Sequence, residues 1–175
     1  MKNQILTIDN KEEEKFLRKK TAEFDFKKNN KKDTLSLLLD MKKIMQKADG
    51  VGLSANQIGL NLKLFVAQVP DKDGIMKFYA IFNPTIEKSS DEKNIFEEGC
   101  LSVPGKWGDV ERPEKITISG FDKLGRPIKI KAWGFLARVF QHEIDHLNGK
   151  LFIDRATKIY EVQSKKEENE LTKNI

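Results

Sequence analysis

Two histidines and one cysteine are the strong soft-metal ligands of this sequence, and they fall in two short segments. His142, Glu143 and His146 form the pattern H-E-x-x-H, and Cys100 lies in the pattern E-G-C-L-S. On a helix, residues four positions apart lie on one face, so both imidazole rings can bind one metal ion. The carboxylate beside the first histidine is then held where it can exchange protons with a metal-bound water. The spacing predicts a metal-dependent hydrolase.

The third metal ligand decides which hydrolase the pattern indicates. Metzincin proteases use a third histidine, but this sequence has Phe152 at that position and contains only two histidines. Thermolysin-like proteases use a later glutamate, and the candidates between Glu161 and Glu170 lie in a highly charged segment. Cys100 is the better candidate, because one thiolate and two imidazoles leave an open position for water. A zincin-type endopeptidase with a downstream glutamate stays as one alternative, and a non-catalytic protein with a structural metal stays as another.

Three segments, in a fixed order along the chain, carry a resemblance to a known family. They are residues 50–57 (GVGLSANQ), 98–102 (EGCLS) and 141–147 (QHEIDHL). The sequence resembles peptide deformylases, whose first motif reads G-x-G-L-A-A-x-Q. Ser54 replaces the first alanine of that motif, and the other two segments match without departure. The resemblance covers about residues 51–154.

The resemblance implies an amide hydrolase that removes the formyl group from the N-terminal methionine of nascent polypeptides. It implies one divalent metal ion at the Cys-His-His site, with iron(II) expected in the cell and zinc, nickel or cobalt as alternatives in purified protein. In this interpretation Glu143 is the general base and acid. The side chain of Gln57 and the main-chain N–H of Leu101 are expected to donate hydrogen bonds to the oxyanion.

The resemblance also implies a pocket for the methionine side chain. Ordinary core packing explains the apolar members of this set equally well on the sequence alone. Arg138 is expected to pack its stem on the methionine while its charge reaches water. Gly52 and Gly99 are expected to allow close approach of an extended peptide, and Trp107 is expected in a loop near the entrance. The implied pocket residues are Val51, Phe96, Phe135, Arg138 and Val139.

Hydrophobic spacing predicts the elements that position these residues. Residues 134–147 are apolar on most sides, which predicts a buried helix that carries both histidines. A second helix is predicted over residues 34–48, with Thr34 as its N-cap. We therefore predict an α+β fold in which antiparallel strands and hairpins wrap a central buried helix. The predicted strands are residues 62–69, 78–82, 115–120 and 127–132, and the last two form a hairpin.

Length and charge set the expected domain organisation. The chain of 175 residues predicts a single catalytic domain over residues 1–154 and a charged tail over residues 155–175. In the tail, Ile159, Tyr160 and Val162 are expected to dock as one or two helical turns, with the remainder mobile or weakly helical.

Composition sets the expected compartment and partners. One cysteine excludes an internal disulfide, and no apolar run is long enough to span a membrane. These features favour a bacterial-type cytoplasm, with an organelle as the alternative, and no contact with DNA or membrane. The net charge of +5 is spread along the chain, so it supports only a weak association with the ribosome. Nascent formyl-Met peptides are the expected partners of a monomeric enzyme.

Overall fold

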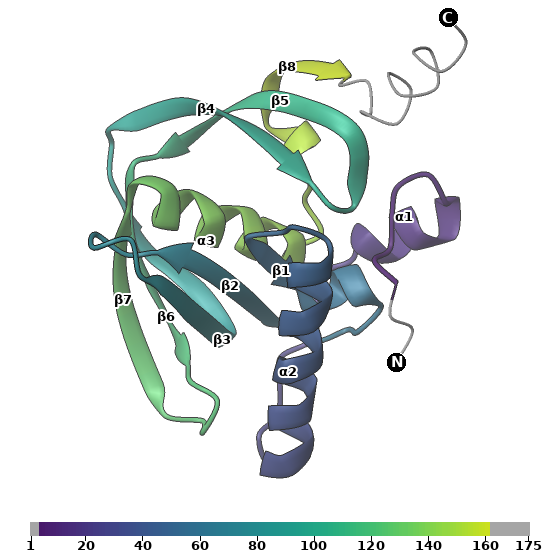
Figure 1. The fold of residues 1–175 in the computed structure, drawn as a ribbon, viewed down its shortest axis with the longest axis vertical. Coiled ribbons are helices and arrows are strands. Elements are labelled where there is room, and N and C mark those ends of the chain that lie inside the picture. Colours follow the sequence, from purple (N-terminus) through teal and green to yellow (C-terminus); the bar gives the residue numbers. More distant parts are fainter. Residues whose placement is uncertain (1–3, 162–175) are drawn as a thin grey trace, which may run out of the picture.

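The computed structural model describes residues 4–161, in which two antiparallel sheets lie on either side of helix α3 (Gly134–Leu147) (Figure 1). The smaller sheet has the strand order β4 (Lys93–Cys100), β5 (Val103–Pro113) and β8 (Ala156–Glu161). The larger sheet has the strand order β1 (Gly52–Ser54), β2 (Leu64–Pro70), β3 (Met76–Ser89), β6 (Lys115–Phe121) and β7 (Pro127–Trp133).

Helix α3 is the centre of the fold because nearly all of its surface is covered. Ten of its residues, from Ala137 to Leu147, are buried. The helix ends at Leu147 with Asn148 as its C-cap, and Gly149 follows with φ of 71°, a left-handed conformation that favours glycine. A Cβ at position 149 would also lie 2.2 Å from the main-chain oxygen of Arg18. The predicted α+β architecture with a central buried helix is confirmed.

The larger sheet packs one apolar face against α3. The hairpin of β6 and β7 has the register Ile118 opposite Ile130, as alternation of apolar residues predicts. Strand β3 is longer than the predicted segment, and β2 begins two residues later than predicted. The core between sheet and helix is formed by side chains that include Phe65, Val69, Ile81, Ile116, Ile118, Phe140 and Ile144.

Helix α2 (Lys31–Lys47) begins three residues before the predicted start. The Asn30 side chain accepts a hydrogen bond from the main-chain N–H of Asp33, so Asn30 is the N-cap. The Thr34 hydroxyl instead donates to the main-chain oxygen of Asn30. Short helices α1 (Lys11–Leu17), η1 (Ala55–Ile58) and η2 (Phe152–Asp154) complete the described elements.

The C-terminal prediction is wrong for residues 156–161, which form strand β8 and not a helical turn. β8 pairs with β5, with Tyr160 opposite Trp107. An exposed strand edge carries unpaired main-chain donors and acceptors, and pairing with β8 satisfies those of β5. The Tyr160 hydroxyl also donates to Glu97. The predicted domain boundary after residue 154 therefore separates β8 from its own sheet. Val162 and the rest of the predicted tail lie outside the described residues.

Strands β4 and β5 are the main elements that the sequence did not predict. They pair from Lys93 opposite Pro113 to Gly99 opposite Trp107, and the register shifts between Gly99 and Cys100. Trp107 thus lies in a strand and not in a loop. Among residues 4–161, β4 pairs with β5 alone, so its other side is an edge of the smaller sheet. No helix in residues 4–161 has the length and apolar character needed to cross a bilayer.

Candidate active site

The three predicted metal ligands come together from two elements. Helix α3 presents His142 and His146 one turn apart, and Cys100 ends strand β4 beside them. One ligand atom from each residue lies within 4.8 Å of the other two, and Cys100 Sγ is 3.1 Å from His146 Nε2. The register shift before Cys100 directs its side chain away from the regular alternation of the strand. One soft thiolate and two imidazoles at this separation fit a single divalent metal ion.

The charges around the cluster favour its metal-binding form. Burial opposes ionisation of Cys100, yet the rings of His146 and His142 lower the pKa of its thiol to about 5. Cysteine is therefore present as the thiolate at neutral pH, which is the form that binds metals. Glu98 Oε2 lies 2.9 Å from His142 Nδ1. This contact leaves Nε2 of His142 as the nitrogen that is free to face the cluster.

Glu143 is buried between two residues of the first motif. Its Oε2 accepts a hydrogen bond of 2.7 Å from the Ser54 hydroxyl. A Cβ at position 52 would lie 2.3 Å from Glu143 Oε1, so only glycine leaves room for the carboxylate. Burial raises the pKa of Glu143, and the two histidines partly offset that increase. A buried carboxylate with a raised pKa is suited to take up and release a proton.

Gln57 is buried and faces the cluster. Its Oε1 accepts from the main-chain N–H of Ser54 at 2.8 Å, which leaves its Nε2 directed toward the site. That nitrogen donates to Ser102 Oγ at 3.1 Å and lies 3.6 Å from Cys100 Sγ. The amide N–H groups of Gln57 are therefore next to Cys100 at the edge of the cluster.

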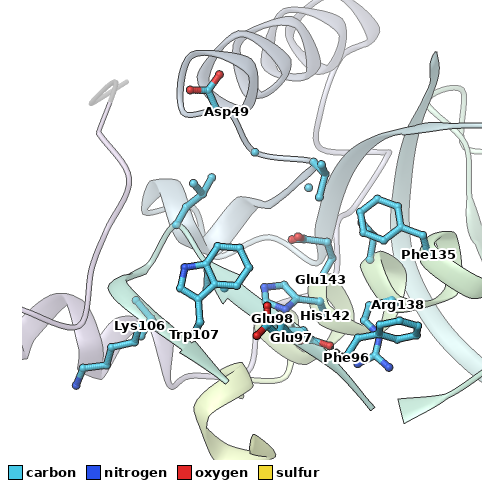
Figure 2. A pocket seen from close by; sticks show the side chains of 18 of the residues that line it. Asp49, Phe96, Glu97, Glu98, Lys106, Trp107, Phe135, Arg138, His142 and Glu143 are labelled. Atoms are coloured by element: carbon cyan, nitrogen blue, oxygen red, sulfur yellow. Dashed lines mark hydrogen bonds and ion pairs between the residues drawn. The ribbon is translucent and has the colours of Figure 1, made fainter. Parts of the chain in front are cut away.

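A cavity of about 820 Å³ opens above this cluster. Figure 2 shows Glu143 and His142 at its centre, with Phe96, Phe135 and Arg138 together on one side and Trp107 on the other. Phe96, Phe135 and Val51 are each about half exposed, so they line the cavity and are not core residues. Trp107 packs against Gly99, where an added Cβ would lie 3.0 Å from the indole ring.

Comparison with known sequences identifies the family. The model of the polypeptide deformylase family matches residues 2–162. A peptide deformylase of Halothermothrix orenii is 47% identical over 130 residues, which cover 74% of this chain and 82% of that protein. A peptide deformylase of Elusimicrobium minutum is 42% identical over 166 residues, covering 92% and 93% of the two chains. The chain belongs to the peptide deformylase family.

Solved structures of peptide deformylases share this fold. A probable peptide deformylase from Synechococcus phage S-SSM7 has a TM-score of 0.78 and 39% identity, covering 87% of this chain and 98% of that one. The peptide deformylase of Thermotoga maritima also has a TM-score of 0.78, with 32% identity and coverage of 89% and 97%. The enzyme is accordingly an amide hydrolase that removes N-formyl groups, and the zincin alternative is not favoured.

The residues that the sequence singled out lie close together. His146 is buried beneath the cavity, and every other predicted site residue lines it. The residues of this lining set are Val51, Gly52, Gln57, Phe96, Gly99, Cys100, Leu101, Phe135, Arg138, Val139, His142 and Glu143.

The expectation for the charge of Arg138 is wrong. The residue is only 7% exposed, and its guanidinium does not reach water as predicted. It donates to Glu98 Oε1 at 2.8 Å and to the side chain of Asn94 at 2.6 Å. Its guanidinium carbon also lies 5.2 Å from the centre of the Phe96 ring. Arg138 therefore borders the cavity as part of an ion-pair network, because the buried carboxylate of Glu98 requires a charged partner.

The network that supports His142 was not predicted from the sequence. Arg112 forms two hydrogen bonds with Glu98, of 2.6 and 2.9 Å, and a third of 2.7 Å with Asp145. Arg155 pairs with the same Asp145. Burial opposes ionisation of Glu98, but Arg112 and His142 lower its pKa well below the usual value. Two of these residues lie inside the motifs, Glu98 in EGCLS and Asp145 in QHEIDHL. The motifs therefore contained both residues, but the sequence alone did not indicate what they do.

Proposed function

We propose that Cys100, His142 and His146 hold one divalent metal ion and that Glu143 transfers the protons of deformylation. The observation that carries this proposal is the buried carboxylate of Glu143, held beside the three-ligand cluster at the base of the cavity. When bound, the metal ion supplies an activated water and a Lewis acid for the formyl oxygen. Glu143 would take the proton that water gives up on attacking the formyl carbon, and would pass it to the amine nitrogen as the C–N bond breaks and formate is released.

The other site residues bind and orient the formyl-methionine end of the peptide. Gln57 Nε2 and the main-chain N–H of Leu101 donate to the oxyanion that develops on the formyl group. The aromatic and aliphatic side chains of the cavity receive the methionine side chain, and the paired guanidinium of Arg138 keeps Phe96 in position. Gly52 and Gly99 border the path of the peptide main chain, which extends toward strand β4. The methionine pocket is formed by Val51, Phe96, Phe135 and Val139.

Replacement of Glu143 by Gln tests the proton-transfer role. The amide has nearly the same size as the carboxylate, so the variant should bind metal normally and lose about 10²–10⁴-fold in kcat. Activity is measured on a formyl-Met peptide and metal content on the same sample. Cys100→Ala is the companion variant, and it should lose the metal together with the activity. Near-normal turnover by Glu143→Gln would contradict the assignment.

Iron(II) is the proposed metal in the cell. A thiolate and two imidazoles bind iron(II), but air oxidises the metal ion, the sulfur or both. The iron-loaded enzyme should lose activity in air much faster than the nickel-loaded enzyme prepared in parallel. Equal rates of loss would argue against iron(II) bound through Cys100.

The proposed setting is a bacterial-type cytoplasm, with an organelle as the alternative. The enzyme is proposed to act as a monomer on nascent chains and to associate weakly with the ribosome. Similarity to deformylases of bacteria such as Halothermothrix orenii supports this setting. Sedimentation of the purified enzyme with and without ribosomes tests both the oligomeric state and the association.

A further inference from the structure

His142 and His146 differ in what holds the ring nitrogen that faces away from the cluster. Nδ1 of His142 lies 2.9 Å from Glu98 Oε2. Nδ1 of His146 is buried and has no hydrogen-bond partner in the part of the chain that the structure describes. Because Nε2 of His146 lies 3.1 Å from Cys100 Sγ, Nε2 is the nitrogen directed at the cluster. One of the two proposed ligands therefore has a partner that fixes its ring, and the other does not.

Asn56 carries a buried acceptor oxygen without a donor among the described residues. It lies in η1, is 1% exposed, and donates from Nδ2 to the main-chain oxygen of His146 at 2.7 Å. Its Oδ1 is buried and also lacks a partner among residues 4–161. Within that range, this oxygen and Nδ1 of His146 are the two buried side-chain atoms in this condition. An acceptor without a donor and a nitrogen without a partner thus belong to two residues that already touch.

The chemistry of a metal-binding histidine connects these two observations. A neutral imidazole that binds a metal through Nε2 carries its proton on Nδ1 and can only donate there. Buried donors nearly always have an acceptor, and the acceptor of a metal-binding histidine fixes the orientation of its ring. Glu98 is engaged by His142 and two arginines, so it does not serve His146. Among the side chains of residues 4–161, Asn56 Oδ1 is the buried oxygen without another partner.

We propose that Asn56 is the positioning residue of His146. The two atoms are not within hydrogen-bond distance of each other, so Oδ1 accepts the Nδ1 proton of the metal-bound ring through one enclosed water molecule. Asparagine suits this position because it offers a donor for the His146 main chain and an acceptor for the His146 ring from one short side chain. This inference rests on the proposed metal site.

Nuclear magnetic resonance of the zinc-loaded enzyme, labelled with ¹⁵N in histidine, tests the proposal directly. The chain has only two histidines, so two ring systems account for all signals. Both Nδ1 protons should be protected from exchange with water. The signal that changes in Glu98→Gln belongs to His142, because Glu98 lies beside its Nδ1. In Asn56→Leu, the Nδ1 proton of His146 should exchange at least about tenfold faster. Rapid exchange of this proton in the unaltered enzyme would overturn the inference, while failure of zinc to bind the three residues would overturn the metal site itself.

Metal retention separates the two hydrogen-bonding roles of Asn56. Asn56→Asp keeps an acceptor and loses the Nδ2 donor, whereas Asn56→Leu loses both. Loss of zinc to a chelator should become about tenfold faster in Asn56→Leu and stay within about threefold in Asn56→Asp. Equal acceleration in both variants would show that only the main-chain contact matters and would overturn the proposal. If Asn56→Asp does not fold, the exchange measurement on the unaltered enzyme decides.

Thr21→Val is the matched control. The Thr21 hydroxyl donates to the main-chain oxygen of Leu147 at 3.0 Å, which is a similar buried bond at the same end of α3. It does not involve an imidazole ring. The control variant should be less stable to heat, with an unchanged rate of zinc loss. A rate in Thr21→Val as fast as that in Asn56→Leu would show that any weakening of this helix end releases the metal, and would overturn the assignment to Asn56.

Discussion

The larger and the smaller sheet contact helix α3 with different kinds of side chain. On the side of the larger sheet, Phe140 packs against Phe65 and Tyr79, with ring centres 5.3 and 5.2 Å apart. On the side of the smaller sheet, Arg112 joins Glu98 and Asp145 through buried hydrogen bonds. Apolar contacts stabilise a fold but tolerate small changes of position, whereas charged hydrogen bonds require fixed geometry. We infer that the first interface mainly stabilises the enzyme and that the second orients the metal ligands.

Replacement of Arg112 by Met should produce the largest combined effect. It removes one of the cations paired with the buried carboxylates of Glu98 and Asp145, which costs about 3–5 kcal/mol of stability. His142 loses the fixed position of Glu98, so metal affinity should fall about 10–100-fold. Urea unfolding and metal competition measure the two effects. Normal metal affinity in this variant would remove the distinction between the two interfaces.

Phe140→Ala tests the apolar interface with a similar loss of stability. Removal of this fully buried ring should cost about 3–5 kcal/mol. Metal affinity and kcat should stay within about twofold at a temperature where the variant is folded, because the ring contacts the larger sheet. Phe140→Leu is the control and should cost less. A drop in metal affinity as large as that of Arg112→Met would count against the comparison.

Removal of the metal ion should affect the two interfaces unequally. A ligand present at a thousandfold excess over its Kd contributes about 4 kcal/mol to stability, and this contribution is lost on chelation. Hydrogen exchange should increase most in β4 and at the histidine end of α3. Strands β6 and β7, which meet α3 through apolar contacts, should change little. An equal increase in hydrogen exchange in both sheets would show that the metal stabilises the fold as a single unit.

Ser54→Ala should have the smallest effect of the four changes. It removes the hydroxyl that donates to Glu143 Oε2, and restores the alanine of the family motif. The variant should fold normally, with kcat lower by about twofold to tenfold and KM unchanged, since a typical net hydrogen bond is worth about 0.5–1.5 kcal/mol. Ser54→Thr keeps the hydroxyl and should retain more activity if the added methyl is accommodated. An unchanged kcat in Ser54→Ala would show that the packing of Gly52 alone positions Glu143.

The elements with strong hydrophobic periodicity could be predicted from the sequence, and the charged interface could not. Helix α3 and the β6–β7 hairpin follow from the spacing of their apolar residues. Strand β4 has no such signal, because most of its residues are exposed or line the cavity. Arg112 and Asp145 resemble surface residues in the sequence, and only their mutual pairing across distant segments explains their burial.

At the site, the motifs predicted the cluster of ligands but not the hydrogen bonds around it. The pattern of H-E-x-x-H and E-G-C-L-S located the cluster, because ligand spacing is a local property of the chain. The hydrogen bonds of Ser54 in β1 and Asn56 in η1 depend on how these two elements pack against α3, which no local spacing encodes. The side chain of Arg138 was misjudged for the same reason, since Arg138 lies in α3 and its partners Glu98 and Asn94 lie in strand β4.

The exposed edge of strand β4 bears on how many different peptides the enzyme accepts. Among residues 4–161, the edge of β4 that does not pair with β5 is free, and residues of β4 line the cavity. A peptide that adds to a strand edge is held through main-chain groups, which are the same in every protein. Only the first side chain would then enter the cavity. An enzyme that bound peptides in this way would process the products of very many genes, because it would select the beginning of a chain and be indifferent to most of the later residues.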